Sequence, residues 1–453
     1  GAMAGGAGFD IAARSGLATV GAAAWLLVAA AAVALSGRIR GRSGALLIGT
    51  APVLGLLLFL RSSPWVIVPV TVGIAVLIFT GVSLGADGGR LNMTFPGLAA
   101  RTGLALGHLG LGPGLLSPGG LAAGGVARRR ALALGRGVLL GVPVMIVVGV
   151  LLGLADPIFR SWFDLPAILQ HLALVAVGAW AVLGLQRAAS AERPSPSLPS
   201  APALGTTEAA VVLSGLCALY AAFVVAQFVA LSGAGHRILV THGLTYAEYA
   251  RSGFFQLLAC AAITLVVLLG VHACANPARP VLLSLSGLTA ALTLGVVVVA
   301  VLRLRLYEAA FGLTMLRLAC TVAAVWIGVV FAALGATLVR HGLPRRYLPA
   351  AVLISGLIFV AGWGAANPAA IVAQANLGRA DHGRTFDVRH AASLGPDAMP
   401  ALLAGLRELH QDQAAGLRNA ICAQPSWPDE GAAFNVSKAS ADEARARACH
   451  QPG

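Results

Sequence analysis

Long apolar runs are the feature that most limits what this chain can fold into. A helix needs about 20 consecutive apolar residues to cross the hydrocarbon core of a bilayer. Runs of about this length occur near residues 19–36, 45–60, 65–84, 137–154, 167–186, 207–231, 253–274, 281–301, 309–337 and 348–364. They predict an all-α fold, a polytopic transmembrane helical bundle of about ten spans. The 45–60 run is short, and a tilted or partial span is also compatible with it.

Charged side chains are too scarce to cover a water-facing surface. Only 11% of the 453 residues are charged and 58% are hydrophobic, whereas soluble domains usually carry about 25% charged residues. The formal net charge of +14 would suggest nucleic acid as the partner of a soluble protein. Here the arginines cluster in short loops between apolar runs, as membrane orientation requires. We therefore expect the lipid bilayer as a partner, and no nucleic acid.

The arginine clusters predict which way the chain crosses the membrane. They lie at residues 38–42, 128–136 and 340–346. With ten spans all three fall on one face, and positively charged loops stay in the cytoplasm. Both termini then lie outside. Abundant Ala, Gly and Arg are typical of a GC-rich bacterial genome, so we expect a multi-pass protein of the bacterial plasma membrane with an extracytoplasmic C-terminal domain.

The sequence divides into three parts. Residues 1–18 form an N-terminal tail whose start is typical of a protease-cleavage scar, 19–364 the transmembrane domain, and 365–453 a small helical C-terminal domain. Within the transmembrane part, leucines recur at helical spacing in the connection 85–136, which predicts a helix on the membrane surface. Residues 188–205 are rich in Ser, Pro and Ala and are interpreted as a flexible linker.

Capping residues predict where helices of the C-terminal domain begin. Asn367-Pro368 is typical of an N-cap followed by proline in the first helical position. Asp397 can cap the segment that runs through Leu402 and Leu406. Ser440 and Glu443 have the spacing of a capping box in front of the final helix.

The cysteines fall into two groups. Cys217, Cys260, Cys274 and Cys320 lie within apolar runs, where a free cysteine is a small buried hydrophobe. Cys422 and Cys449 lie in the polar C-terminal part. Because disulfides persist outside the cytoplasm, this second group predicts a disulfide, and the prediction agrees with the expected orientation.

Ionisable residues inside spans are costly, so each is a candidate for a functional role. At the start of the ninth span, Arg303, Tyr307, Thr314 and Arg317 recur at helical spacing and predict one stripe. On this stripe Arg317 lies about 20 Å beyond Arg303, with Glu308 close by. Two interpretations stay open: an outward-open cavity that receives an anionic headgroup or relays protons, and a buried Arg–carboxylate pair that fixes helix packing.

A second polar cluster precedes the seventh span. Thr245 and Glu248 have capping-box spacing, so Glu248 can simply satisfy backbone donors. Tyr246 and Tyr249 suit an interfacial aromatic belt. Arg251 leads directly into the apolar run, where it either pairs with a carboxylate or offers its fork to a ligand carboxylate or phosphate.

Other signals are weaker. Asp156 ends the fourth span, where Pro157 disfavours continued helix, and Gln227 in the sixth span is expected to form hydrogen bonds across helices. No known catalytic motif is found, and we expect no cofactor. His382 and His390 lack a matching set of metal ligands, so we expect no metal site.

Four stretches of the chain carry a resemblance to a known family. They are Gly135-Arg136-Gly137 through Phe159, then Leu244 to Phe255, then Arg303 to Arg317, and the C-terminal residues Asn367-Pro368, Asn376, Asp387, Asp397-Ala398-Met399-Pro400 and Phe434-Asn435-Val436-Ser437. In these stretches the chain resembles a bacterial membrane family known as domain of unknown function 4153/4173. The likeness covers about residues 130–447. It implies a polytopic layout with an outer C-terminal domain, and it implies no activity.

Three functional hypotheses follow. The first is a non-catalytic membrane protein that binds or transports a small amphipathic or anionic ligand, such as a lipid, through an outward-facing polar cavity. The second is an envelope sensing or assembly protein whose C-terminal domain docks a protein partner. The third is a membrane-embedded lipid-modifying enzyme. The candidate ligand-binding residues are Asp156, Gln227, Tyr246, Glu248, Tyr249, Arg251, Arg303, Tyr307, Glu308 and Arg317.

Overall fold

The computed structural model describes eight continuous stretches of the chain and a few isolated positions. The stretches are 7–12, 19–34, 41–85, 206–231, 254–274, 280–339, 347–427 and 431–449, and the isolated positions are 171, 174–175, 178–179 and 182. These residues form helices, and none of them lies in a strand. The predicted span at 137–154 and the predicted surface helix lie outside them, as does most of the predicted span at 167–186.

Each of the eight remaining predicted spans forms an apolar helix. The bounds are Val20–Ala34 (α2), Arg42–Leu60 (α3), Pro64–Gly85 (α4), Thr206–Leu231 (α9), Phe254–Cys274 (α12), Pro280–Phe311 (α13), Met315–Val339 (α14) and Leu348–Ala365 (α15). Within the described residues six of them, α3, α4, α9, α13, α14 and α15, are long and apolar enough to cross a membrane. The protein is therefore a multi-pass helical membrane protein. The short run at 45–60, for which a tilted or partial span was an alternative, forms a helix of 19 residues.

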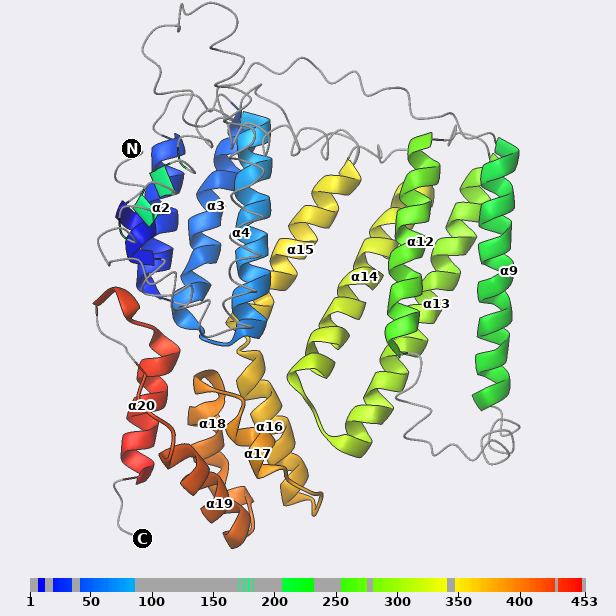
Figure 1. Cartoon of the computed structure of the whole chain (residues 1–453). Helices are drawn as coiled ribbons and strands as arrows, with labels where there is room; N and C mark the ends of the chain where they lie inside the picture. Colours follow the sequence, from blue (N-terminus) through cyan, green and yellow to red (C-terminus); the bar gives the residue numbers. More distant parts are fainter. Residues whose placement is uncertain are drawn as a thin grey trace, which may run out of the picture.

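The bundle has two halves that meet at α15 (Figure 1). Helices α2, α3 and α4 share a core that includes Leu54, Val70 and Leu77, and Leu357 of α15 packs against it. Helices α9, α12, α13 and α14 share a second core, which contains the fully buried Phe331. Because α15 contributes side chains to both cores, it joins the two halves.

Polar contacts inside the second half cross between helices. The Sγ of Cys217 on α9 lies 3.1 Å from the Oγ1 of Thr289 on α13. The hydroxyl of Tyr220 contacts Thr264 on α12. Hydrogen bonds of this kind hold helices together in lipid, where apolar burial contributes little to association. They give Cys217 and Tyr220 a packing role.

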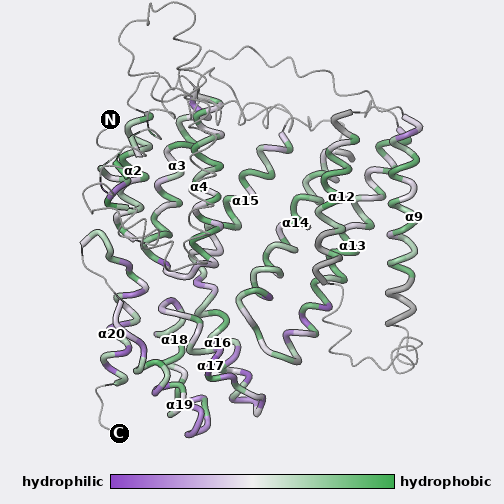
Figure 2. The backbone as a smooth tube through the Cα atoms, viewed as in Figure 1, coloured by the Kyte–Doolittle hydropathy of each residue, from purple (hydrophilic) through white to green (hydrophobic). Residues whose placement is uncertain are grey.

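One end of the bundle, here called the tail end, carries the C-terminal domain. Helix α2 begins there, because the N–H of Val20 donates to the carbonyl of Phe434 over 3.0 Å. The turns between α3 and α4 and between α13 and α14 also lie there (Figure 1). The C-terminal ends of α2 and α14 and the N-terminal ends of α3 and α15 consequently lie at the opposite end. Two of the three arginine clusters follow α2 and α14 in the sequence. Figure 2 shows the bundle as mostly hydrophobic, with hydrophilic residues concentrated in the C-terminal helices.

The short helices that follow α15, called the C-terminal domain here, pack around a core to which Met315 of α14 also contributes. Its elements are Pro368–Asp381 (α16), Val388–Ala392 (α17), Pro396–Ala398 (η3), Met399–Ala404 (α18), Gly405–Glu408 (η4), Gln411–Cys422 (α19), Gly431–Ala433 (η5) and Val436–Cys449 (α20). The buried core includes Leu377, Met399, Leu402, Leu417 and Ile421.

Two predictions about this domain are confirmed. Cys422 and Cys449 form a disulfide that joins the ends of α19 and α20. Asn367 caps α16, since its side chain accepts a 3.2 Å hydrogen bond from the N–H of Ala370. It does so with a φ of 53°, a conformation that asparagine tolerates better than most residues.

Two capping predictions are wrong. Asp397 does not cap the helix that follows it but lies in η3, where its carboxylate binds backbone of the α3–α4 turn. Ser440 and Glu443 lie inside α20, which begins at Val436. The cap of α20 is Asn435, which accepts a 3.2 Å hydrogen bond from the N–H of Lys438.

Candidate functional site

The predicted stripe on the ninth span is interrupted by a turn. Helix α13 continues to Phe311 and α14 begins at Met315, so Arg303 and Tyr307 lie on one helix and Arg317 on the next. The stripe and the 20 Å separation predicted along it are therefore wrong. The turn folds Arg317 back onto α13, with its guanidinium carbon 4.1 Å from the centre of the Tyr307 ring.

Gly312 allows this turn to be tight. Its φ is +83°, and a Cβ there would lie 2.8 Å from the Oδ1 of Asn376. The Gly312 carbonyl accepts a hydrogen bond from Nη1 of Arg317. Glycine is therefore required twice, by the positive φ and by the close approach of a neighbouring helix.

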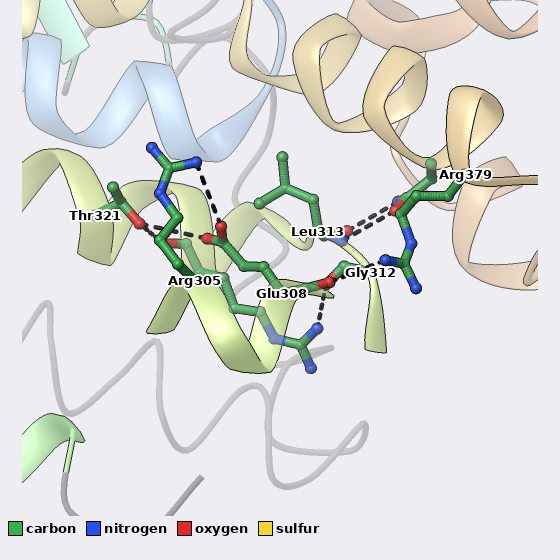
Figure 3. Close-up of polar contacts among 8 residues, drawn as sticks. Arg305, Glu308, Gly312, Leu313, Thr321 and Arg379 are labelled. Atoms are coloured by element: carbon green, nitrogen blue, oxygen red, sulfur yellow. Dashed lines mark hydrogen bonds and ion pairs between the residues drawn. The ribbon is translucent and has the colours of Figure 1, made fainter. Parts of the chain in front are cut away.

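Glu308 lies at the centre of the polar contacts around this turn (Figure 3). Its Oε1 accepts a 3.4 Å hydrogen bond from the Oγ1 of Thr321 on α14. Its Oε2 lies 3.8 Å from Nη1 of Arg305, whose side chain is 68% exposed. A pair of this kind, long and open to solvent on one side, contributes little to stability. The Glu308 carboxylate therefore ties α13 to α14 chiefly through Thr321.

Helix α16 of the C-terminal domain fastens this turn from outside. The side-chain amide of Asn376 pairs with the backbone of Leu313, donating to its carbonyl over 2.8 Å and accepting from its N–H over 2.9 Å. Nη1 of Arg379 donates to the carbonyls of Glu308 and Ala309, at 3.2 and 2.7 Å. The last carbonyls of a helix lack partners within it. Arg379 thus caps α13, and both residues fix the turn to the C-terminal domain.

A second contact fastens the C-terminal domain to the other half of the bundle. The buried carboxylate of Asp397 accepts hydrogen bonds from the N–H groups of Ser62, at 3.0 and 3.2 Å, and Ser63, at 2.7 Å. These residues directly precede α4, so the carboxylate satisfies donors at a helix N-terminus, where negative charge is favoured. The C-terminal domain consequently bridges the two halves.

The end of α3 is tied to the end of α15 at the same corner. Nε and Nη2 of Arg61 donate to the carbonyls of Gly364 and Ala365, both over 2.9 Å. The fully buried Asn435 donates to the carbonyls of Leu58 and Arg61, at 3.3 and 3.1 Å. Arg61 therefore caps α15. Asn435, at the start of α20, caps the end of α3.

A groove of about 780 Å³ lies between α4, α14 and α15. Its lining is almost entirely apolar and includes Trp65, Val72, Ala323, Trp326, Gly356 and Trp363. A Cβ at Gly356 would touch the Trp326 ring at 3.4 Å, so the glycine leaves room for that ring. Arg303, Tyr307, Glu308 and Arg317 do not line this groove. The sequence hypothesis of a polar cavity therefore does not describe it.

Most other predicted site residues cannot be placed. Asp156, Tyr246, Glu248, Tyr249 and Arg251 lie outside the described residues, and Gln227 lies in α9 at a position whose side chain is not described. Among the described residues no group of three or more His, Cys, Asp or Glu is arranged to hold a metal ion.

Sequence reasoning did not identify the groove or the residues that fasten the C-terminal domain. Arg61, Arg305 and Arg379 were not singled out. Asn376, Asp397 and Asn435 appeared only in the family resemblance or as helix caps. Polar residues next to the ends of apolar runs were the available signal, but the sequence does not indicate their partners.

Comparison with protein-family models gives a match over most of the chain. A family model described as "Domain of unknown function (DUF4153)" matches residues 22–405. The match begins well before the stretch in which the resemblance was seen and ends before Phe434-Asn435-Val436-Ser437. No curated protein and no solved structure matches the chain.

Proposed function

Because the chain belongs to the DUF4153 family, whose function is unassigned, we propose from its geometry that it is a non-catalytic membrane protein that binds or moves a small amphipathic molecule. The observation that carries this proposal is the apolar groove between α4, α14 and α15. Its volume falls within the range of roughly 300–1,000 Å³ that is usual for small-molecule sites.

The composition of the groove points to the kind of ligand. It is built from three helices that are each able to span the membrane, so its walls face hydrocarbon or an apolar ligand. The most polar elements of its lining are the indole groups of Trp65, Trp326 and Trp363. A ligand that fits these walls has a long apolar part.

The polar residues at the α13–α14 turn have a different role in this proposal. Arg317 bonds a carbonyl of its own turn, and Glu308 accepts from Thr321. These contacts support a packing role for the cluster, although the second interpretation expected a buried Arg–carboxylate pair, and Arg317 and Glu308 instead contact a backbone carbonyl and a threonine. We therefore place the ligand in the groove and assign Glu308 and Arg317 to holding the turn.

The location of the protein follows from the same layout. The C-terminal domain lies at the end of the bundle opposite the C-terminal ends of α2 and α14 (Figure 1). In the sequence these two helices are followed by arginines at 38, 40, 340, 345 and 346. If the segments that carry these arginines are cytoplasmic, the C-terminal domain is extracytoplasmic. We propose this orientation in the plasma membrane.

Filling the groove tests the proposal. Ala323 of α14 is half-buried and lines the groove, so Ala323→Phe places a ring inside it. We expect the amphipathic material that copurifies with the protein, measured by lipid mass spectrometry, to fall about tenfold, since steric overlap of this size costs roughly 1–3 kcal/mol. Ala332→Phe on the same helix is the control, because Ala332 is exposed and lies outside the groove. An equal effect of both substitutions would count against the groove as the ligand site.

A further inference from the structure

We infer that the occupant of the groove is a phospholipid from the leaflet at the tail end, with one acyl chain in the groove and its phosphate beside Arg61. This inference rests on the proposed function. It adds the class of ligand, the orientation of the ligand in the membrane and the residue that binds the polar part of the ligand. Three observations carry it: the length of the groove, the side chains at one of its ends, and the position of one arginine.

The groove has the depth of a single leaflet. Its lining on α4 runs from Pro64 to Val76 and on α15 from Val352 to Trp363. At 1.5 Å per residue these stretches measure about 18 Å and about 16 Å. Half of a typical hydrocarbon core is about 15 Å. Pro64 begins α4 and Trp363 lies in the last turn of α15, so the groove starts at the tail end. On α4 it stops at Val76, just past the middle of that helix.

Two tryptophans mark the end of the groove that faces the headgroups. Trp65 is 40% exposed. The backbone carbonyl of Trp65 accepts a 2.8 Å hydrogen bond from Nε1 of Trp363. Tryptophan is enriched at the boundary between hydrocarbon and water, where its ring is in lipid and its N–H finds a polar partner. The tail end of the groove is therefore at the depth of the lipid headgroups, and the other end is at the depth of the chain ends.

Arg61 lies beside this end of the groove. It precedes Pro64 by three residues, and its guanidinium bonds the carbonyls of Gly364 and Ala365, directly after the groove residue Trp363. These bonds use Nε and Nη2. A guanidinium has five N–H donors in a planar fork, and this geometry suits a phosphate group. The remaining donors of Arg61 can therefore bind a phosphate while the residue still caps α15.

The nearby carboxylate does not oppose this binding. Asp397 is 3% exposed and its oxygens accept hydrogen bonds from Ser62 and Ser63. These donors stabilise the charge on the Asp397 carboxylate, and burial shields the carboxylate from solvent. The phosphate of a bound phospholipid can therefore contact the guanidinium of Arg61, and one acyl chain of the same lipid extends along α4 into the groove.

Native mass spectrometry of the full-length protein in detergent tests the inference with three lipids that share the same oleoyl chains. Dioleoyl phosphatidylglycerol and dioleoyl phosphatidylcholine carry a phosphate, and dioleoylglycerol does not. We expect the protein to retain both phospholipids about tenfold more tightly than dioleoylglycerol, the usual effect of a hydrogen bond to a charged group. Equal retention of all three lipids overturns the inference.

Arg61→Gln tests the assigned residue. Glutamine can still donate one hydrogen bond to the end of α15, but it carries no charge. We expect retention of the two phospholipids to fall about tenfold, while retention of dioleoylglycerol is unchanged. Arg305→Gln is the control, because Arg305 is an exposed arginine near the tail end that does not line the groove. If Arg61→Gln weakens phospholipids and dioleoylglycerol equally, Arg61 acts only on α15 and the assignment of the phosphate is wrong.

Photocrosslinking tests the direction of the chain. A phosphatidylcholine with a diazirine at the end of one chain should label residues near Val76 and Val352, and one with a diazirine next to the glycerol should label residues near Trp65 and Trp363. The opposite pattern overturns the assignment to the tail-end leaflet. Ala323→Phe separates this inference from the proposed function: if that substitution removes copurified material that contains no phosphate, the function stands and the phospholipid inference fails.

Discussion

The carboxylate of Asp397, in the C-terminal domain, accepts a 2.7 Å hydrogen bond from the backbone N–H of Ser63, immediately before helix α4. The residues are 334 positions apart in the sequence. Because the first N–H groups of a helix have no partner within it, a distant aspartate serves here as the cap. The contact joins the C-terminal domain to the membrane helices, because the buried Asp397 carboxylate gains donors and the start of α4 gains an acceptor.

Removal of this carboxylate should destabilise the protein. We expect Asp397→Ala to lower the free energy of unfolding by about 2 kcal/mol, since loss of a cap and of charged hydrogen bonds at a buried site costs this much. Thermal unfolding in detergent, followed by tryptophan fluorescence, measures the change. Asp381→Ala is the control because Asp381 is an exposed aspartate at the end of α16, and it should leave the unfolding temperature unchanged. Equal stability of the two variants would show that the Asp397 contact contributes nothing.

The amide of Asn376 should hold the α13–α14 turn. In Asn376→Ala the N–H and carbonyl of Leu313 lose their partners, and leaving such groups unsatisfied costs roughly 1–3 kcal/mol. We expect hydrogen exchange at residues 312–314 to become faster. The matched variant Asn419→Ala replaces an exposed asparagine of α19. Unchanged exchange in Asn376→Ala, or an equal increase in both variants, contradicts the anchor.

Gly312 should resist substitution far more than a glycine within a helix. Gly312→Ala forces a Cβ into a position with φ +83° and 2.8 Å from Asn376, so we expect a loss of about 1–3 kcal/mol. At Gly215 of α9 an added Cβ meets nothing within 4 Å, and alanine in mid-helix is favoured by roughly 0.5–1 kcal/mol. Thermal unfolding of Gly312→Ala and Gly215→Ala should therefore shift in opposite directions.

These contacts show what hydropathy can and cannot predict. Apolar runs form helices because lipid offers no hydrogen-bond partners, so the backbone N–H and C=O groups must pair with each other. Each apolar run within the described residues is a helix. Two spans were also predicted at 281–301 and 309–337, but the boundary between them was placed at residues 302–308, where charged side chains interrupt the apolar runs. The turn instead lies at residues 312–314, so the charged stretch belongs to the end of α13. Hydropathy thus predicted the number of helices here and not the position of the turn.

The site was harder to predict for a related reason. The groove consists of ordinary apolar side chains from three helices, and none of Val72, Ala323 or Gly356 is unusual in its own helix. Asp397 looked like a local cap because the spacing to its own helix fits, whereas its partners Ser62 and Ser63 are distant in sequence. Capping rules describe neighbours along the chain, and here the cap is supplied by tertiary structure.

The disulfide should stabilise the C-terminal domain. It closes a loop between residues 27 positions apart, and a bridge of that length typically contributes about 3 kcal/mol through the unfolded state. We expect Cys422→Ser, Cys449→Ser and the double variant to lower the unfolding temperature by the same amount, because each removes the same bond. A double variant that is much less stable than either single one would indicate a separate role for a thiol. Cys217→Ser, in α9 of the bundle, serves as the comparison because it replaces a cysteine that forms no disulfide.

The orientation of the chain can be tested with two cysteines introduced on opposite sides. Asp381 is exposed at the end of α16, in the domain that we place outside the cytoplasm, and Arg345 lies in the connection between α14 and α15. In intact cells a membrane-impermeant maleimide should label Asp381→Cys, and it should label Arg345→Cys only after the cells are opened. The protein without an introduced cysteine is the control, because Cys260 and Cys320 are only partly buried, whereas Cys422 and Cys449 are bonded to each other. The reverse labelling pattern would place the arginine-bearing connections outside, contrary to the retention of positive loops in the cytoplasm, and would assign the groove to the inner leaflet.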